Sequence, residues 1–304
     1  MILLQQMIVL FIYMMIGYFC CKKGWLDIET SDKISWIVVN IANPGLIISA
    51  AVNGERQVAG KELFYITGVA VVLFLALIVV GMIVPVLFRI PKDKRGIFNS
   101  MSTFNNIGFM GFPIISATYG NEALLYASVF VLPFNALIYT YGISRIGGGA
   151  GGREKFQLKK ILNIGVYSCL ISLIISVCQI QVPDFVKTTT AGLSDLTAPL
   201  SMMVIGMSLT KLNLKELFLD LKMIVFCLVK LLLIPVLGMM VVNRVIDSEM
   251  LCAVCMIMMA TPAASITVML AQQYHGDVEM ASKGVALTTV LSVVTIPIVS
   301  AIVF

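Results

Sequence analysis

The sequence predicts an all-α integral membrane protein in which ten transmembrane helices form two inverted repeats of five. Of its 304 residues, 59% are hydrophobic and only 12% are charged, a composition that a soluble domain could not bury. The charged residues gather in short clusters between apolar stretches of about 20 residues, the length at which a helix crosses a bilayer. In addition, an apolar segment is interrupted by a proline at Pro113, and a second apolar segment is interrupted in the same way 149 positions later, at Pro262.

Ten apolar stretches define the expected helices. They cover approximately residues 2–21, 33–53, 63–88, 97–118, 123–145, 161–181, 189–210, 219–242, 250–272 and 281–303. The third stretch is long enough to tilt in the bilayer, and Pro85 near its end is expected to bend or end the helix.

Three landmarks of the first half recur in the second half at nearly constant offsets. They are Lys-Glu-Leu-Phe at positions 61–64 and 215–218, with an offset of 154; Pro44 and Pro199, with 155; and Pro113 and Pro262, with 149. This spacing indicates two homologous halves of five helices each. Because five is odd, the second half must be inverted in the membrane, and the broken fourth and ninth helices are expected to cross.

The repeat divides the chain into three parts. Residues 1–145 form the first five-helix repeat, residues 146–158 a cytoplasmic linker, and residues 159–304 the second repeat. The linker is rich in glycine, but it lacks the Lys-Ser/Thr ending and the strand-to-helix setting of a phosphate-binding loop. We therefore expect a flexible connection.

The distribution of basic residues predicts the orientation in the membrane. Sixteen of the 21 lysines and arginines lie in the odd-numbered connections between helices, and four lie in the even-numbered ones. The positive-inside rule then places the odd connections in the cytoplasm and both termini outside, in a multi-pass protein of the cell (plasma or inner) membrane. The net charge of +5 is concentrated in the cytoplasmic connections and indicates contact with anionic lipid rather than with nucleic acid.

The two broken segments supply the candidate substrate-binding residues. These are Asn105, Asn106, Gly108, Gly111 and Pro113 in the first segment, and Thr261, Pro262 and Ser265 in the second. Prolines and glycines free backbone groups at membrane depth, where such groups must find partners or line a cavity. If the segments cross near the midplane, freed helix N-termini direct partial positive charge into a shared cavity, which suits a carboxylate. The alternative is that these residues only kink their helices.

Two ionisable residues are candidates for the same site. Lys230 lies inside the eighth apolar stretch, where a lysine is costly and usually faces a polar interior, although it could also snorkel to the headgroups. Asp195 is the acidic residue nearest to a membrane-embedded position. It could pair with Lys230, bind a coupling cation or proton, or sit near the outer mouth as a helix-start acid.

The sequence favours neither an enzyme nor a metal site. Cys252 and Cys255 have a metal-like spacing, but they lie in an apolar stretch without partner ligands. His275 is the only histidine, so neither a Ser-His-Asp set nor a His-Glu-x-x-His motif is available, and we expect no catalytic residue, cofactor or metal. Glu279 and Lys283 are four residues apart and are expected to form an ion pair at the end of a helix.

The broken segments resemble those of the auxin efflux carrier family, which includes plant PIN-formed auxin carriers and bacterial malate or malonate permeases. The segment Asn106–Pro113 is similar to the family's N-x-x-x-M-G-x-P crossover, and the segment from Ala260 to Tyr274 is similar to its second crossover. The resemblance implies a scaffold of helices 1, 2, 6 and 7, and a transport domain of helices 3–5 and 8–10 that moves as an elevator. It also implies a homodimer. The short linker departs from the long loop of many plant members and favours a bacterial-type permease.

We therefore expect a secondary transporter of a small organic anion, a mono- or dicarboxylate. Two alternatives remain open: a sodium-coupled organic anion symporter like the related bile acid symporters, with Asp195 as a coupling residue, and an anion-sensing membrane receptor. The sequence offers no soluble signalling domain that would favour the receptor.

Overall fold

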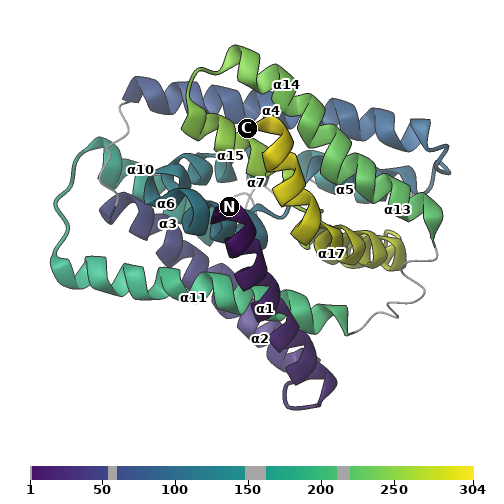
Figure 1. The fold of residues 1–304 in the computed structure, drawn as a ribbon, viewed down its shortest axis with the longest axis horizontal. Helices are drawn as coiled ribbons and strands as arrows, with labels where there is room; N and C mark the ends of the chain where they lie inside the picture. Colours follow the sequence, from purple (N-terminus) through teal and green to yellow (C-terminus); the bar gives the residue numbers. More distant parts are fainter. Residues whose placement is uncertain (1, 54–59, 148–161, 211–219) are drawn as a thin grey trace. The chain divides into compact units, whose positions relative to one another are not determined.

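A computed structural model of the chain describes residues 2–53, 60–147, 162–210 and 220–304 (Figure 1). They form helices and no strand; an isolated antiparallel bridge joins Asn105 to Ala263. The predicted all-α class is therefore confirmed for this part of the chain. The predicted linker, residues 146–158, falls almost wholly outside it.

The described residues form the following helices in chain order. They are α1 (Ile2–Lys22), α2 (Ile28–Ile37), α3 (Asn43–Val52), α4 (Gly60–Leu87), α5 (Arg95–Thr103), α6 (Phe112–Val129), α7 (Val131–Leu137), α8 (Ile143–Gly147), α10 (Ile164–Val177), α11 (Asp184–Leu209), α13 (Leu221–Leu228), α14 (Ile234–Val245), α15 (Glu249–Ala260), α16 (Ile266–Gln273) and α17 (Val278–Val303). Four π-helical turns lie between them: η1 (Val38–Ala42), η2 (Ile107–Gly111), η3 (Ile138–Gly142) and η5 (Val229–Leu233).

Seven helical segments of the described chain are long and apolar enough to cross a membrane. They are Leu3–Lys22, Ile28–Val52, Gly60–Leu87, Ile107–Ile146, Asp184–Leu209, Leu221–Val245 and Val278–Val303. Two further apolar helices, α10 and α15, are shorter than a bilayer-spanning helix needs. The organisation into ten spans and two inverted repeats stays a prediction.

Several predicted stretches are divided where the backbone leaves the helical conformation. The stretch 97–118 is interrupted after α5, and 250–272 is split into α15 and α16. Gly120 has φ 78° and ψ −170°, which kinks α6, and a glycine adopts this conformation without steric cost. Pro85 lies in the last turn of α4, which ends two residues later, as the sequence predicted.

Three of the π-helical turns are explained by the proline that follows them. Pro44, Pro113 and Pro235 each occupy the first turn of the helix after a π-helical turn. A proline inside a continuous α-helix clashes with the carbonyl four residues earlier and donates no hydrogen bond, so a wider turn upstream relieves the strain. Pro199, by contrast, lies inside the continuous helix α11. The two prolines paired by the predicted repeat, Pro44 and Pro199, therefore have different local structures.

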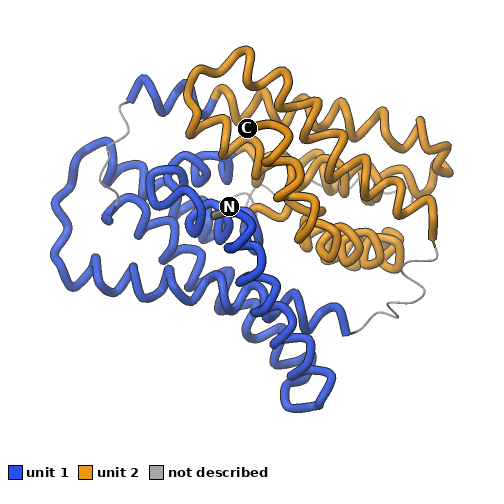
Figure 2. Tube along the Cα trace, viewed as in Figure 1, with its two compact units in different colours: residues 1–67, 108–132, 162–213 blue, residues 68–107, 133–161, 214–304 orange. Residues whose placement is uncertain are grey.

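The chain divides into two compact units (Figure 2). Unit 1 comprises residues 1–67, 108–132 and 162–213, and unit 2 comprises residues 68–107, 133–161 and 214–304. Each unit is therefore assembled from three separate parts of the sequence.

Unit 1 is organised around a close contact between α1 and α11. A Cβ atom added to Gly206 would lie 1.9 Å from the carbonyl oxygen of Met14, and one added to Gly17 would lie 2.2 Å from that of Met203. The two backbones thus touch, which small residues permit in membrane helix pairs. In the same unit, the Ser172 hydroxyl donates to the Ile47 carbonyl at 2.9 Å and joins α10 to α3.

Gly206→Val is expected to separate α1 from α11 and to lower the midpoint of thermal unfolding in detergent. The new side chain meets backbone atoms, which cannot move aside as a flexible side chain can, so the cost should reach about 1–3 kcal/mol or more. Gly192→Val is the matched control, because Gly192 lies on the same helix and an added Cβ there meets nothing within 4 Å. Equal midpoints for the two variants would refute the close packing of these helices.

Unit 2 is built around α15. Every residue from Leu251 to Ala260 is buried, and a helix that is apolar on all sides belongs in the centre of a bundle. Two pairs of aromatic rings also pack in unit 2: the ring centroids of Phe98 and Phe226 are 4.8 Å apart, and those of Phe104 and Phe134 are 5.8 Å apart. Within unit 2, these ring contacts join α5 and the residue that follows it to α13 and α7.

Candidate functional site

Two helix interruptions pair with each other inside unit 2. The first, residues 104–106, follows α5, and the second, residues 261–265, separates α15 from α16. The amide of Asn106 donates to the carbonyl of Pro262 at 2.8 Å, and the amide of Ala264 donates to the carbonyl of Phe104 at 2.9 Å. Asn105 and Ala263 thus face each other as in an antiparallel ladder. Each interruption satisfies backbone groups that the other has freed, as a site buried at membrane depth requires.

The local sequence explains where each helix stops. Thr261 precedes Pro262 and is extended, with φ −66° and ψ 152°, because a residue before proline is disfavoured in the α region. On the other side, Phe104 is extended with φ −102° and ψ 117°, and the two asparagines that follow are poor helix formers.

Asn105 connects three parts of unit 2 through its side chain. The residue is 1% exposed. Its amide nitrogen donates to the carbonyl of Met258 and contacts that of Met259 at 3.4 Å, and its amide oxygen accepts from the Lys230 ammonium. Both polar atoms of its side chain are therefore engaged, the nitrogen with the last turn of α15 and the oxygen with the eighth predicted helix.

Lys230 is buried in the protein interior. It is 1% exposed and lies in the π-helical turn Val229–Leu233, which precedes Pro235. A snorkelling lysine would extend its side chain to the lipid headgroups. The Lys230 ammonium instead donates a hydrogen bond to the Asn105 side chain. Within the described chain no carboxylate forms an ion pair with it. The hydrogen-bond partner of the buried Lys230 ammonium is thus a neutral amide.

Further polar groups surround the paired interruptions. The Asn106 amide donates to the Ser265 hydroxyl at 3.3 Å, and the Thr261 hydroxyl donates to the Met258 carbonyl at 3.4 Å. Asn106 and Thr261 are buried, and Ser265 is partly exposed. The structure thus brings together six of the predicted residues: Asn105, Asn106, Thr261, Pro262, Ser265 and Lys230.

Thr288 is a member of this cluster that the sequence analysis missed. Its hydroxyl accepts from the amide of Ala263 at 3.2 Å and donates to the Gly284 carbonyl at 2.7 Å. It therefore fixes the second interruption to α17. The adjacent threonines at 288 and 289, in the middle of α17, were the available signal.

The structure places Gly108, Gly111 and Pro113 outside the paired interruptions, and their part in the site stays a prediction. The first helix break falls at residues 104–106, upstream of all three. Gly108 and Gly111 belong to the π-helical turn Ile107–Gly111, and Pro113 belongs to the first turn of α6. All three fall in unit 1, where a Cβ added to Gly108 would meet the Asn43 amide at 3.3 Å. The physical reason is that the π-helical turn accommodates Pro113 without a break.

For Asp195, the structure excludes one of the three roles considered. It is exposed and lies in the middle of α11, which begins at Asp184, so it is not a helix-start acid. It belongs to unit 1, whereas Lys230 belongs to unit 2.

The described residues contain no group of three or more His, Cys, Asp or Glu side chains that could hold a metal ion. The predicted pair of Glu279 and Lys283 is present, with a distance of 2.5 Å.

A family model described as membrane transport protein matches residues 2–155 and residues 152–300. The chain is 25% identical to an uncharacterized transporter of Methanocaldococcus jannaschii over 310 aligned positions, which cover 97% of each chain. It is 21% identical to an uncharacterized transporter of Methanothermobacter thermautotrophicus, over 96% of this chain and 95% of the relative.

Proposed function

The chain belongs to the membrane transport protein family, the family of the auxin efflux carriers, and on this basis we propose that it is a secondary transporter of a small organic anion. The anion is a mono- or dicarboxylate. The family and the seven candidate spans make the chain a multi-pass membrane protein. The orientation proposed from the basic residues places both termini outside the cytoplasm.

One observation carries the proposal of an anionic substrate: the Lys230 ammonium is buried beside a neutral amide. A charge buried at membrane depth is costly unless an opposite charge compensates it, and such residues usually mark a substrate path. A carboxylate next to Lys230 would supply the missing charge. The amides and hydroxyls of Asn105, Asn106 and Ser265 would then orient its oxygens through hydrogen bonds.

The substrate enters the site by displacing existing hydrogen bonds. In the described conformation, Lys230 and Asn106 are each bonded to another side chain of the cluster. A carboxylate would take the place of the Asn105 oxygen at the ammonium. The hydrogen bonds lost and formed are similar in number. The favourable free energy of binding therefore comes mainly from bringing opposite charges together in a medium of low dielectric constant.

We further propose an elevator mechanism, in which ten helices in two inverted repeats form a scaffold and a transport domain of a homodimer. The division into two units supports this proposal, since α1, α2, α3, α10 and α11 belong to unit 1 and the whole polar cluster belongs to unit 2. The unit boundaries depart from whole helices at residues 108–132, which fall in unit 1. The moving body would then include α5 and leave α6 behind.

Transport assays in proteoliposomes test the proposal. Purified protein is first screened by thermal unfolding against malate, malonate and monocarboxylates, with and without sodium, because a ligand of the folded state raises the unfolding temperature. The carboxylate with the largest shift is then used in a flux assay, where we expect saturable uptake. A carboxylate that stabilises the protein without crossing the membrane would indicate a receptor instead. Uptake that requires sodium would indicate the bile acid symporter type.

A further inference from the structure

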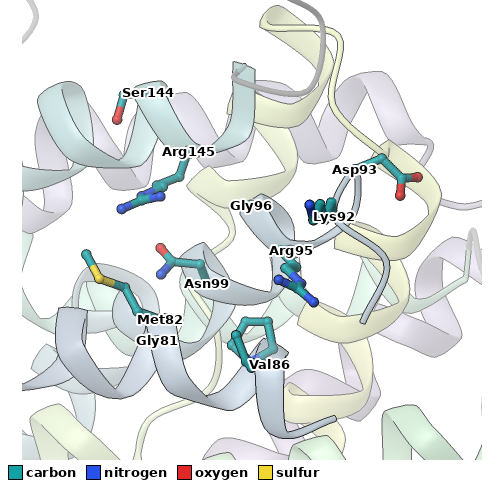
Figure 3. Close-up of a pocket in the computed structure, with 11 residues that line it drawn as sticks. Gly81, Met82, Val86, Lys92, Asp93, Arg95, Gly96, Asn99, Ser144 and Arg145 are labelled. Atoms are coloured by element: carbon teal, nitrogen blue, oxygen red, sulfur yellow. The ribbon is translucent and has the colours of Figure 1, made fainter. Parts of the chain in front are cut away.

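A pocket with several charged residues in its wall lies in unit 2, outside the paired interruptions. Its volume is about 420 Å³, and it is enclosed by α4, α5, α8 and the residues before α5 (Figure 3). None of the residues of the polar cluster around Lys230 lines it. The transport proposal assigns this pocket no role.

The pocket wall carries an excess of positive charge. Lys92, Arg95 and Arg145 line it together with one acidic residue, Asp93. Figure 3 shows the Asp93 carboxylate well apart from Asn99 and Arg145. The guanidinium of Arg95 donates to the carbonyl of Ile90 at 2.8 Å, which holds its side chain in place. Three cations at one pocket favour an anionic ligand.

Asn99 is a second, independent sign of a ligand. It is 4% exposed and lines the pocket, and its amide oxygen is buried without a hydrogen-bond partner. Buried polar groups are nearly always paired, so an unpaired one at a pocket indicates a missing partner. A rotation of the amide group by 180° exchanges its oxygen and nitrogen, so the side chain can present its N–H to an anion.

The position of Arg145 is fixed by the backbone. A Cβ added to Gly96 would lie 2.0 Å from the carbonyl oxygen of Arg145, so α5 and α8 touch at this glycine. The Arg145 guanidinium also lies over the ring of Tyr141, 5.0 Å from its centroid. The pocket is therefore a built feature of α5 and α8 rather than a chance gathering of surface side chains.

The outer wall of the pocket is apolar and faces away from the protein. Met82 and Val86 line the pocket, and with Leu75 and Val79 they form one face of α4, because their spacing is four, three and four residues. The four side chains are 42–55% exposed. Since α4 is a candidate membrane span, this exposed apolar face is available to lipid tails.

We propose that this pocket binds the phosphate of an anionic phospholipid, with one acyl chain along the exposed face of α4 formed by Leu75, Val79, Met82 and Val86. Lys92 and Arg145 contact the phosphate, and Asn99 donates a hydrogen bond to it. The connections that carry these basic residues are the ones expected in the cytoplasm, where the leaflet is negatively charged and basic pockets between helices bind lipid headgroups.

Lipid titrations of delipidated protein in detergent test the site. The thermal unfolding midpoint is followed against phosphatidylglycerol, against phosphatidylcholine with the same acyl chains, and against inorganic phosphate. We expect phosphatidylglycerol to act at the lowest concentration. Arg145→Gln should weaken its apparent affinity by about tenfold or more, since it removes a charge-assisted contact. Arg244→Gln is the matched control. Arg244 lies in the last turn of α14, in the same unit, and its substitution should leave the affinity within about twofold.

Lys92→Gln provides a second variant at an exposed position, should Arg145→Gln fail to fold, and it should weaken the same lipid in the same way. Equal affinity for both phospholipids would overturn the proposal. So would an equal effect of the pocket variants and the Arg244→Gln control. Stabilisation by inorganic phosphate as strong as that by phosphatidylglycerol would assign the pocket to a soluble anion and would also overturn it.

Discussion

Lys230→Met is expected to raise the apparent dissociation constant for the transported carboxylate tenfold or more. The substitution keeps a long unbranched side chain and removes the ammonium, so the anion loses its opposite charge at a buried position, an effect of about 1.4 kcal/mol or greater. The substitution removes the cost of a buried charge but leaves the Asn105 amide oxygen without its donor, so we expect the two effects on stability to offset each other in part. The measurement is a ligand-induced thermal shift, followed by the concentration dependence of uptake.

Lys222→Met is the matched control for this experiment. Lys222 is exposed in α13, the helix that leads into the turn of Lys230, and its substitution removes the same charge from the same part of the chain. Binding should be unchanged in that variant. If Lys230→Met bound the carboxylate as tightly as wild type, the site would have to bind anions through the amides and hydroxyls alone.

The sequence predicted the two interruptions because their causes are local. Pro262 ends α15 through its effect on Thr261, and the pair Asn105 and Asn106 marks the end of α5. The exact position of the first break was less well predicted. Pro113 was the strongest signal in the segment, but a π-helical turn accommodates it, and the break falls where the partner segment supplies hydrogen bonds to residues 104 and 106.

The partner of Lys230 could not be predicted from the sequence. Its depth in the helix was compatible with snorkelling and with burial, and the choice depends on Asn105, 125 positions away. Thr288 was missed for the same reason, since its contact with Ala263 joins two helices. The assignment of residues 108–132 to unit 1 likewise depends on packing between distant segments. Local patterns thus predict where helices break, whereas the contacts that assemble a site depend on the tertiary fold.

Asn105→Ala is expected to abolish uptake and to lower the midpoint of thermal unfolding. The asparagine satisfies the Lys230 ammonium and the Met258 carbonyl at once, and both are left buried without this partner in the variant. A hydrogen bond to a charged group contributes about 1.5–3 kcal/mol. Asn99→Ala is the matched control, since Asn99 is a buried asparagine of the same unit whose amide oxygen has no partner, and its loss should cost less.

A double-mutant cycle separates the two roles of Asn105. In the Lys230→Met background no buried charge remains to be satisfied, so Asn105→Ala should there cost only its contact with α15 and the volume of the side chain. The stability effects of the two substitutions should therefore be non-additive, with a coupling of about 0.5–3 kcal/mol, as for directly interacting residues. Additive effects would show that the ammonium is stabilised without Asn105. The proposed exchange of the Asn105 oxygen for a substrate carboxylate would then lose its basis.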